Sequence, residues 1–385
     1  MQRKKLFTLL FFINFAVTFS YGIFDSFFSL YLFSVGVRGS LLGIPMAVYA
    51  LSKIFLSVPI GNVSDKISCK KTLTAAIGLY TLIAFLYLFA DDISIIILLR
   101  FLQGFASALL RPTLLSYINT IADDDNIASV SGKFDISFYS ALGLGPVCGG
   151  IIRNYCGFYG LFITMSIICT LALFTSATFM KDNDSGSRSK YQKQEFITPN
   201  IFALMIFIFG RTIGISTVFT FLPIFIENSL HLDSMQTGII LAASTVSMTL
   251  LLSTFGRIGD IVPKTALITT GGICASFFIT ILPITSDFIS ILVFSAILGI
   301  SGAMSQPPSV AMLLEEGGKC GIGKASGYFN LSMNAGFALG PVLGSILMAH
   351  YGINTVFYIS GSVGILFTLS FLLISSGFKA VTRPD

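Results

Sequence analysis

The chain has 385 residues, of which 54% are hydrophobic and only 11% are charged, and its formal net charge is +5 at pH 7. Soluble domains carry about 25% charged residues, so this composition excludes a soluble globular protein and indicates a chain embedded in a lipid bilayer. Lysine and arginine lie in short clusters between apolar runs. The positive charge therefore reflects membrane topology and gives no reason to expect nucleic-acid binding.

Twelve apolar segments are long enough to cross a bilayer as helices, which takes about 20 residues each. The predicted spans are 6–34, 41–62, 72–90, 93–118, 131–153, 157–180, 199–227, 236–256, 264–284, 288–314, 323–349 and 353–377. Strands of a membrane barrel would be about 10 residues long and alternate in polarity, and the sequence lacks that pattern. The first segment has the basic start of a signal peptide, but its apolar run continues past Tyr21 to Leu32 without a cleavage site. We therefore interpret it as a retained span.

The lysines and arginines predict the orientation of the chain. If the N-terminus is cytoplasmic, the cytoplasmic segments hold 17 of the 23 basic residues, and the outer loops hold two, Arg38 and Arg153. Because cytoplasmic loops carry the excess of Lys and Arg, we expect a multi-pass protein of the cell membrane (inner or plasma) with both termini in the cytoplasm.

The second half of the sequence repeats the first at a constant offset. Gly-x-x-x-Asp occurs at 61–65 and again at 256–260, and GPVCG at 145–149 aligns with GPVLG at 340–344. The same offset aligns Gly104 with Gly299. The chain is therefore predicted to contain two homologous six-helix bundles, 1–180 and 199–385, joined by a cytoplasmic polar linker at 181–198.

Two parallel six-span repeats, with substrate held between them near the midplane, are typical of rocking secondary transporters. At this point the sequence resembles the major facilitator superfamily over nearly its whole length. The motif G-x-L-x-D-R-x-G-R-K is matched at Gly61, Asp65, Lys66 and Lys70, with departures at Val63, Ser68 and Cys69. R-x-x-Q-G is matched at Arg100, Gln103 and Gly104, and G-x-x-x-G-P-x-x-G-G at Gly145, Pro146, Gly149 and Gly150, with Ala141 replacing its first glycine. The resemblance implies an all-α integral membrane fold of 12 transmembrane helices in two pseudo-symmetric bundles, working by alternating access.

The first motif implies a cytoplasmic latch. In the family the Asp65 position is understood to lie near the N-terminus of a helix in the other half, where the partial positive charge favours an anion. The latch would form in the outward-open state and break as the halves rock. Its repeat at Gly256 and Asp260 is weaker, because Ile261 and Pro263 stand where a basic residue and a glycine are usual. The alternative is that the turn only caps the second span and fixes topology.

The third motif bears on the direction of transport. In the family, Gly145, Pro146 and Gly149, repeated here at Gly340 and Pro341, are associated with exporters that exchange substrate for a cation. Small residues let helix backbones approach closely, and proline permits a bend. The alternative is a packing kink that is indifferent to direction.

Five ionisable residues fall inside the predicted spans, where each would cost about 2.5–3.5 kcal/mol at a helix centre unless it pairs or faces water. They are Asp25, Lys53, Arg100, Arg111 and Arg211. By helical periodicity, Arg100, Gln103 and Arg111 share one face of the fourth span, and Asn14, Tyr21 and Asp25 share one face of the first. Helices 1, 4, 7 and 10 line the cavity in the family, which adds Arg211 and Gln306 to the candidate substrate and coupling residues.

Four basic groups against one acid favour an anionic or zwitterionic substrate, because the planar fork of arginine holds carboxylate or phosphate well. Asp25 and Arg100 are close enough in depth to pair. A carboxylate that loses its arginine partner during rocking could take up a proton, whereas a permanent structural ion pair is the equal alternative. The alternative to a coupling role for Arg100 is a structural role. The alternative to substrate contact for Lys53 is that its side chain snorkels to the membrane interface.

The favoured function is proton-coupled export of a small amphipathic compound, drug-like or a metabolite, by a monomer. One alternative is a transporter of an organic anion (a carboxylate, phosphate ester or siderophore-like molecule), including one that imports it. A remote alternative is a membrane sensor that no longer transports. The sequence has no nucleotide-binding loop, no nucleophile–base pair and no metal-ligand spacing, so we predict no enzyme activity, no metal and no cofactor beyond the coupling proton.

Overall fold

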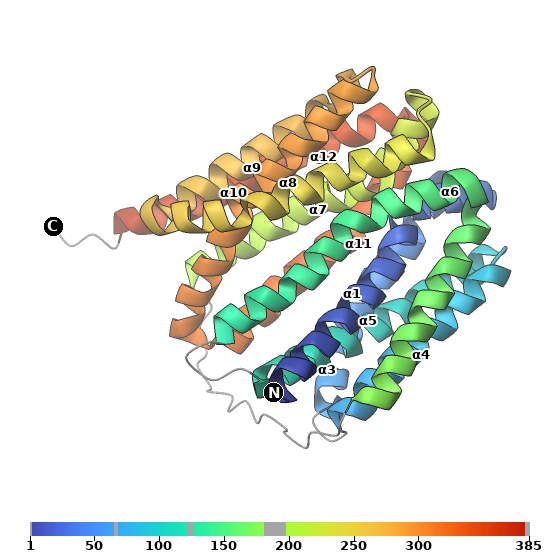
Figure 1. The fold of residues 1–385 in the computed structure, drawn as a ribbon. Coiled ribbons are helices and arrows are strands. Elements are labelled where there is room, and N and C mark those ends of the chain that lie inside the picture. Colours follow the sequence, from blue (N-terminus) through green and yellow to red (C-terminus); the bar gives the residue numbers. More distant parts are fainter. Residues whose placement is uncertain (1, 65–67, 122–126, 181–197, 382–385) are drawn as a thin grey trace. The chain divides into compact units, whose positions relative to one another are not determined.

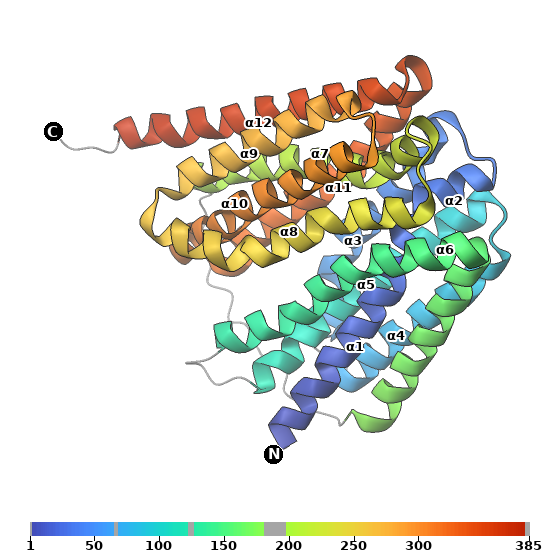
Figure 2. The ribbon, with the colours of Figure 1, turned by 45° about the horizontal axis from the view of Figure 1, so that its top comes forward.

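The computed structural model describes residues 2–64, 68–121, 127–180 and 198–381, and every element in these ranges is a helix (Figure 1, Figure 2). The α-helices are α1 Gln2–Asp25, α2 Phe28–Ser34, α3 Ile44–Ser64, α4 Cys69–Leu86, α5 Ile93–Ile121, α6 Ile127–Phe179, α7 Pro199–Ser229, α8 Ser234–Ile261, α9 Lys264–Ile281, α10 Phe288–Cys320, α11 Ile322–Tyr351 and α12 Ile353–Val381. Short 3₁₀ turns are η1 Gly39–Gly43, η2 Tyr87–Phe89 and η3 Leu282–Ile284.

These helices confirm the predicted all-helical membrane fold of twelve spans. Ten helices in the described part of the chain are long and apolar enough to cross a bilayer, and α6 holds two spans in one. The direction of α6 breaks at Gly157, which has φ 64° and ψ −165°. Because only glycine adopts such a conformation without strain, Gly157 joins the fifth and sixth spans without a loop. The second span is α3.

The first span differs from its prediction as one helix over 6–34. The structure ends α1 at Asp25 and begins α2 at Phe28, with Phe27 between them at φ −111° and ψ 9°. The hydroxyl of Ser26 donates to the carbonyl of Gly22 at 3.0 Å. The prediction of a continuous helix was wrong here, because a single glycine at position 22 inside a long apolar run is also common within membrane helices and does not by itself signal a break.

The chain packs into two compact units. Unit 1 comprises Met1–Val37, Val48–Arg188 and Asp233–Ala242, and unit 2 comprises Arg38–Ala47, Ser189–Leu232 and Ala243–Asp385. Each unit thus contains one six-helix repeat together with the first residues of the second helix of the other repeat. The predicted linker at 181–198 lies outside the described residues except for Thr198, whose hydroxyl caps α7 at the backbone N–H of Ile201.

Glycines related by the repeat make the same close contacts in both units. A Cβ atom at Gly104 in α5 would lie less than 3.0 Å from the carbonyl oxygen of Tyr49 in α3, and one at Gly299 in α10 would do the same at Ser244 in α8. Tyr49 and Ser244 are themselves related by the offset of the repeat. The repeated sequence therefore specifies a repeated helix packing, which fits the use of small residues where membrane helices approach closely.

We expect Gly104→Ala to lower the thermal unfolding temperature of the detergent-purified protein. Its methyl group would collide with Tyr49 and Ser52, and such overpacking costs about 1–3 kcal/mol. Gly78→Ala is the matched control, because a Cβ there meets only Leu173 at an ordinary 3.8 Å and gains helix propensity. An equal effect of the two substitutions would contradict the packing described.

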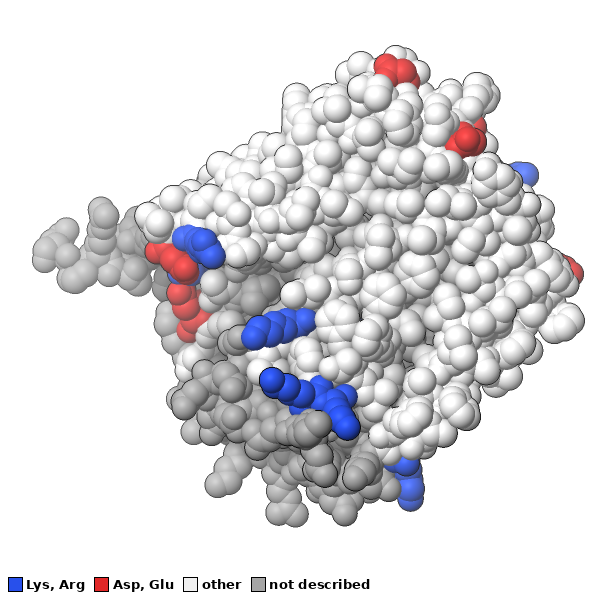
Figure 3. All heavy atoms as spheres, viewed as in Figure 1, with Lys and Arg blue, Asp and Glu red and all other residues white. Residues whose placement is uncertain are grey.

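Charged side chains are sparse on the surface between helix ends. On the face drawn in Figure 3, Lys, Arg, Asp and Glu lie mainly near the ends of helices, and the area between them is almost free of charge. Large apolar side chains are exposed on this part of the helices, among them Phe55, Phe174, Leu250 and Leu373. This is the surface expected of helices that contact lipid.

Candidate functional site

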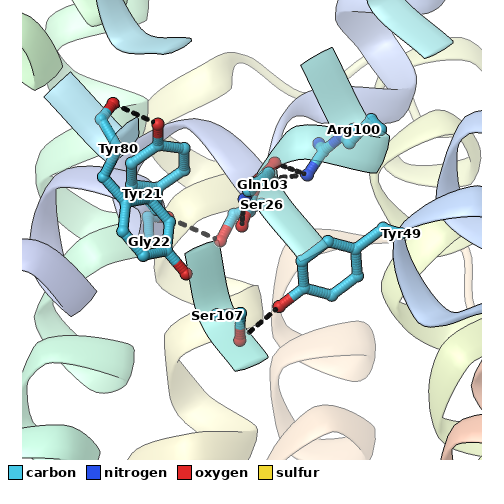
Figure 4. Close-up of polar contacts among 9 residues, drawn as sticks. Tyr21, Gly22, Ser26, Tyr49, Tyr80, Arg100, Gln103 and Ser107 are labelled. Carbon is cyan, nitrogen blue, oxygen red and sulfur yellow. Dashed lines mark hydrogen bonds and ion pairs between the residues drawn. The ribbon is translucent and has the colours of Figure 1, made fainter. Parts of the chain in front are cut away.

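A buried polar cluster in unit 1 joins α1 to α5. Nη1 of Arg100 donates to Oδ1 of Asp25 at 2.7 Å and to Oε1 of Gln103 at 2.8 Å. Nε2 of Gln103 donates to the second oxygen of Asp25 at 3.2 Å. Figure 4 shows Arg100 and Gln103 meeting at this cluster beside Ser26. The structure thus brings together three residues that the sequence placed on two separate helices.

The helix break positions Asp25 in this cluster. Asp25 is the last residue of α1, and the chain turns at Ser26 before α2 begins. Its carboxylate is 25% exposed, whereas the side chain of Arg100 is only 2% exposed. Discontinuous helices are a recurring feature of ion and substrate sites in transporters, because their ends free backbone groups within the membrane. The acid therefore lies at a helix end inside the membrane segment, with its side chain partly exposed.

Two phenylalanine rings support the charge of Arg100. Its Cζ lies 3.4 Å from the ring centroid of Phe28 and 5.7 Å from that of Phe24. The faces of aromatic rings attract cations, so the guanidinium has a carboxylate on one side and ring faces on another. These contacts offset the cost of placing an arginine inside the membrane.

Further polar side chains of unit 1 lie near this cluster. The hydroxyl of Tyr49 in α3 donates to Ser107 in α5 at 3.4 Å, and Nζ of Lys53 lies 5.3 Å from the ring centroid of Tyr49. Figure 4 shows the contact between Tyr49 and Ser107, with Tyr49 on the side of Gln103 away from Tyr80 and Tyr21. Lys53 of α3 is thus linked through Tyr49 to Ser107 of α5, and its role in binding stays a prediction.

A second acid–arginine pair links α5 to α6. Nη2 of Arg111 donates to Oδ1 of Asp135 at 3.2 Å, and the two side chains are 48% and 37% exposed. Phe138 lies 4.7 Å from the guanidinium carbon. Asp135 lies near one end of the predicted span 131–153. It was therefore not counted among the ionisable residues inside the spans. The predicted excess of four basic groups over one acid is therefore smaller than the sequence indicated.

Unit 2 contains the other pair of predicted site residues. Nη1 of Arg211 in α7 donates to Oε1 of Gln306 in α10. Gly302, one turn before Gln306, lies close to the same guanidinium. The structure therefore brings helices 7 and 10 together at these two residues, although a role in binding stays a prediction.

Two predicted site residues serve helix packing in this structure. Asn14 is buried and its Nδ2 donates to Ser137 in α6 at 2.7 Å. The hydroxyl of Tyr21 donates to the backbone carbonyl of Tyr80 in α4 at 2.7 Å. Both bonds hold α1 against its neighbours, so substrate contact by Asn14 and Tyr21 stays a prediction without a geometric argument in its favour.

The predicted latch lies partly outside the described residues. Asp65 and Lys66 fall in the 65–67 gap, Gly61 is in the last turns of α3, and Lys70 is in the first turn of α4. In the second repeat, Gly256 and Asp260 lie near the end of α8, and Asp260 is exposed. The latch therefore stays a prediction.

The glycine-proline motif makes close contacts within each unit. Cβ atoms at Gly145 and Gly149 would lie less than 3.0 Å from the backbone of α1, and one at Gly340 would lie 2.7 Å from a carbonyl oxygen of α7. The carbonyl oxygens of Pro146 and Pro341 would meet Cβ atoms at Gly238 and Gly43, respectively. The motif therefore serves tight packing, and the direction of transport that it implies stays a prediction.

Sequence reasoning missed two polar contacts of unit 2. Glu316 is buried, and its Oε1 accepts a hydrogen bond from Nδ2 of Asn200 at 2.9 Å. Nζ of Lys264 lies 2.8 Å from Oε1 of Glu315. The predicted tenth span ended at residue 314, which put both glutamates in a loop. The polar run that follows gave no signal that α10 continues to Cys320.

The described residues hold no group of three or more His, Cys, Asp or Glu side chains that could bind a metal. A shallow surface groove of about 310 Å³ lies between α6 and the end of α4, lined by Phe85, Ile163 and Ile167 among others. It contains none of the predicted site residues, and its lining is apolar. The polar chemistry of unit 1 therefore lies at the Asp25–Arg100 cluster and not at this groove.

Comparison with known proteins gives a consistent result. The family model of the Major Facilitator Superfamily matches residues 10–207 and 201–384. An uncharacterized MFS-type transporter of Methanocaldococcus jannaschii is 22% identical over 88% of this chain and 90% of its own length. Multidrug resistance protein 2 of Bacillus subtilis is 22% identical over 81% of this chain and 80% of its own length. Quinolone resistance protein NorA of Staphylococcus aureus is 25% identical over 53% of this chain and 55% of its own length.

The solved structure of the nucleoside transporter NupG has the same fold. It superposes with a TM-score of 0.78 and covers 96% of this chain and 99% of its own, at 15% sequence identity. At this identity the likeness concerns the arrangement of the helices and not the substrate.

Proposed function

The chain belongs to the Major Facilitator Superfamily, and on that premise we propose that this secondary transporter exports a small amphipathic compound in exchange for protons, with Asp25 as the proton-binding group. The observation that carries the proposal is the cluster of Asp25 with Arg100 and Gln103. It joins the one acid well inside a span to a nearly fully buried arginine, at a break between two helices.

The cluster can couple a proton to a change of conformation. While Arg100 holds it, the carboxylate is stabilised in its charged form. If α1 shifts against α5 within unit 1, at the break after Asp25, the carboxylate loses its partner in a poorly solvated site, and protonation then stabilises it. The paired and the protonated forms thus belong to different conformations, which is what exchange of a proton for substrate requires.

Two observations support export as the direction. Multidrug resistance protein 2 and the quinolone resistance protein NorA are among the relatives. The fifth span also keeps the motif that the family associates with exporters, here packed closely on α1 through Gly145 and Gly149. The Lys and Arg distribution supports cytoplasmic termini, which makes the loop with Asp91 and Asp92 an outer loop.

The charges of the site favour a zwitterionic substrate. Arg100 and Arg111 each have a carboxylate partner. Lys53 instead lies over the ring of Tyr49, and Arg211 bonds the neutral amide of Gln306. Because of these two basic residues, an organic anion stays the second candidate substrate, since each residue can bind a carboxylate of the substrate.

We expect Lys53→Gln to raise KM for norfloxacin and benzoate, both of which carry a carboxylate, by about tenfold, as the loss of one charge-assisted hydrogen bond implies. Transport of ethidium, a cation, should change little. The measurement is uptake into proteoliposomes of inverted orientation, and Lys133→Gln, at an exposed lysine of α6, is the control. Equal effects on all three compounds would refute a role for Lys53 in recognising charge.

A further inference from the structure

Arg100 uses only part of its guanidinium in the cluster with Asp25. Nη1 makes both hydrogen bonds, while Nε and Nη2 are buried and have no hydrogen-bond partner among the described residues. In a planar guanidinium Nε and Nη2 share one edge, which presents two parallel N–H donors. Buried donors without a partner are rare in native proteins. We therefore expect a hydrogen-bond acceptor at the Nε–Nη2 edge of Arg100.

The hydroxyl of Tyr87 in η2 has the same unusual status. It is buried and has no hydrogen-bond partner in the part of the chain that the structure describes. Tyr87 and Arg100 flank the same ring, because Phe24 lies 4.8 Å from the ring centroid of Tyr87 and 5.7 Å from the guanidinium carbon. The charges of Arg100 and Asp25 both act on the Tyr87 hydroxyl.

Water is the small molecule that suits such a group of atoms. A buried water typically makes about three hydrogen bonds to polar groups that are otherwise unsatisfied. The oxygen of a water at the free edge of Arg100 would accept from these donors and leave both of its hydrogens to donate. The neighbouring rings of Phe24, Phe28 and Phe162 are apolar and offer no hydrogen-bond acceptor of their own.

A second tyrosine connects Tyr87 to the loop that carries Asp91. Tyr31 in α2 is buried, its ring lies 6.2 Å from that of Tyr87, and its hydroxyl donates to the carbonyl of Ala90. Asp91, next along the chain, is exposed, and its charge acts on Tyr31. Tyr31 thus packs its ring near that of Tyr87 and bonds the backbone next to the exposed Asp91.

We propose that Tyr87, together with a water bound at the free edge of Arg100, relays protons between Asp25 and the outer loop at Asp91; this rests on the proposed function of Asp25. In each relay step, a hydronium ion that arrives from the outer medium at the Asp91 loop gives a proton to the Tyr87 hydroxyl oxygen, while the hydroxyl's own proton passes to the water at Arg100. The water passes its excess proton to the carboxylate of Asp25. Tyr87 ends neutral, and one proton has moved to Asp25.

The titratable and charged groups that face this relay come from every element packed around it. They are Tyr21 of α1, Tyr31 of α2, Tyr49 of α3, Tyr80 and Tyr87 of α4 and η2, Arg100 of α5 and Cys169 of α6, with Asp25 at the inner end and Asp91 at the outer. Tyr21 and Tyr80 lie on the other side of Gln103 from Arg100 in Figure 4, so they are not part of the outer route.

The test is the rate at which Asp25 is protonated in the full chain. Proteoliposomes with the Asp91 loop facing outwards are acidified rapidly, and the carbonyl band of the protonated Asp25, identified by its loss in Asp25→Asn, is followed by infrared spectroscopy. Tyr87→Phe should slow the appearance of this band by at least about tenfold, because a positioned proton donor is removed. Tyr117→Phe should not, since Tyr117 is a buried tyrosine of α5 about 25 Å further along the helix.

The outcomes separate the relay from the proposed function. If Asp25 becomes protonated at the wild-type rate in the Tyr87→Phe variant, the relay is refuted while Asp25 remains the proton site. If no such band appears in the wild-type protein, Asp25 is not the proton site, and both proposals fall. Folding of the variant is not a concern, because phenylalanine keeps the ring and removes only an unsatisfied hydroxyl. If Tyr87→Phe raises the unfolding temperature without changing the rate, the Tyr87 hydroxyl binds no water. This result would also refute the relay.

Discussion

Asp25→Asn is expected to abolish the proton movement that accompanies transport, while substrate binding changes by no more than a few-fold. Asparagine has the shape of aspartate and keeps an oxygen that can accept from Nη1 of Arg100. It cannot bind or release a proton. The pH inside proteoliposomes is followed with a trapped dye after addition of norfloxacin. Binding of norfloxacin is measured separately by calorimetry.

Asp92→Asn is the matched control for this experiment. Asp92 is an exposed carboxylate whose Oδ1 accepts from the backbone N–H of Ser94 at 2.7 Å, at the start of α5. This hydrogen bond lowers the pKa of Asp92, so the group stays charged at neutral pH, and asparagine caps a helix equally well. Wild-type proton movement in Asp25→Asn would mean that the pair with Arg100 is only structural. The proton site would then be sought at Asp135 of α6 or at Glu227, an acid near the end of α7.

Arg100→Gln is expected to have the second large effect, on both transport and stability. Removing one partner of a buried ion pair costs about 3–5 kcal/mol, because the other charge is left without compensation. Since the side chain of Asp25 is 25% exposed, we expect the lower end of this range. Transport should fall by about 10²-fold or more, because Asp25 would lose the partner whose binding and release couple the proton to the change of conformation.

A double-mutant cycle tests the physical reason for this effect. Arg100→Gln combined with Asp25→Asn should be more stable than Arg100→Gln alone, since the neutral amide no longer needs the arginine. Thermal unfolding of the four proteins in detergent gives the coupling energy. Additive effects of the two substitutions would contradict a direct energetic link between Asp25 and Arg100.

The sequence predicted the fold well because membrane helices leave a strong signal. Span length, the Lys and Arg bias and the constant repeat all act over long stretches, so local uncertainty averages out. The repeat was informative in detail, since Gly104 and Gly299 make equivalent contacts with Tyr49 and Ser244. The break after Asp25 was not predicted, because Gly22 and Ser26 are residue types that membrane helices also tolerate in their interior, and no proline marks the position.

The candidate site was predicted in part. Helical periodicity placed Arg100 and Gln103 on one face, and depth along the helix placed Asp25 near Arg100, as the structure has them. Periodicity alone could not tell which face meets a neighbouring helix, so Asn14 was assigned to the same polar stripe although it packs against α6.

The pair of Arg111 and Asp135 was within reach of the sequence. The two residues lie at similar distances from the connection between α5 and α6, which run antiparallel as consecutive spans. Comparing depths across that connection, as was done for Asp25 and Arg100, would have placed them together. Including Asp135 would have reduced the predicted basic excess and moved the expected substrate from anion towards zwitterion.

The most direct test of proton-coupled export uses the unmodified protein. Proteoliposomes of inverted orientation are loaded with acidic buffer and placed in neutral medium with norfloxacin, and both the drug and the internal pH are followed. Exchange of substrate for protons predicts that norfloxacin accumulates inside, that the interior becomes less acidic in step with it, and that dissipating the proton gradient with an ionophore stops accumulation. Accumulation that persists without the gradient, or that leaves the internal pH unchanged, would contradict the account.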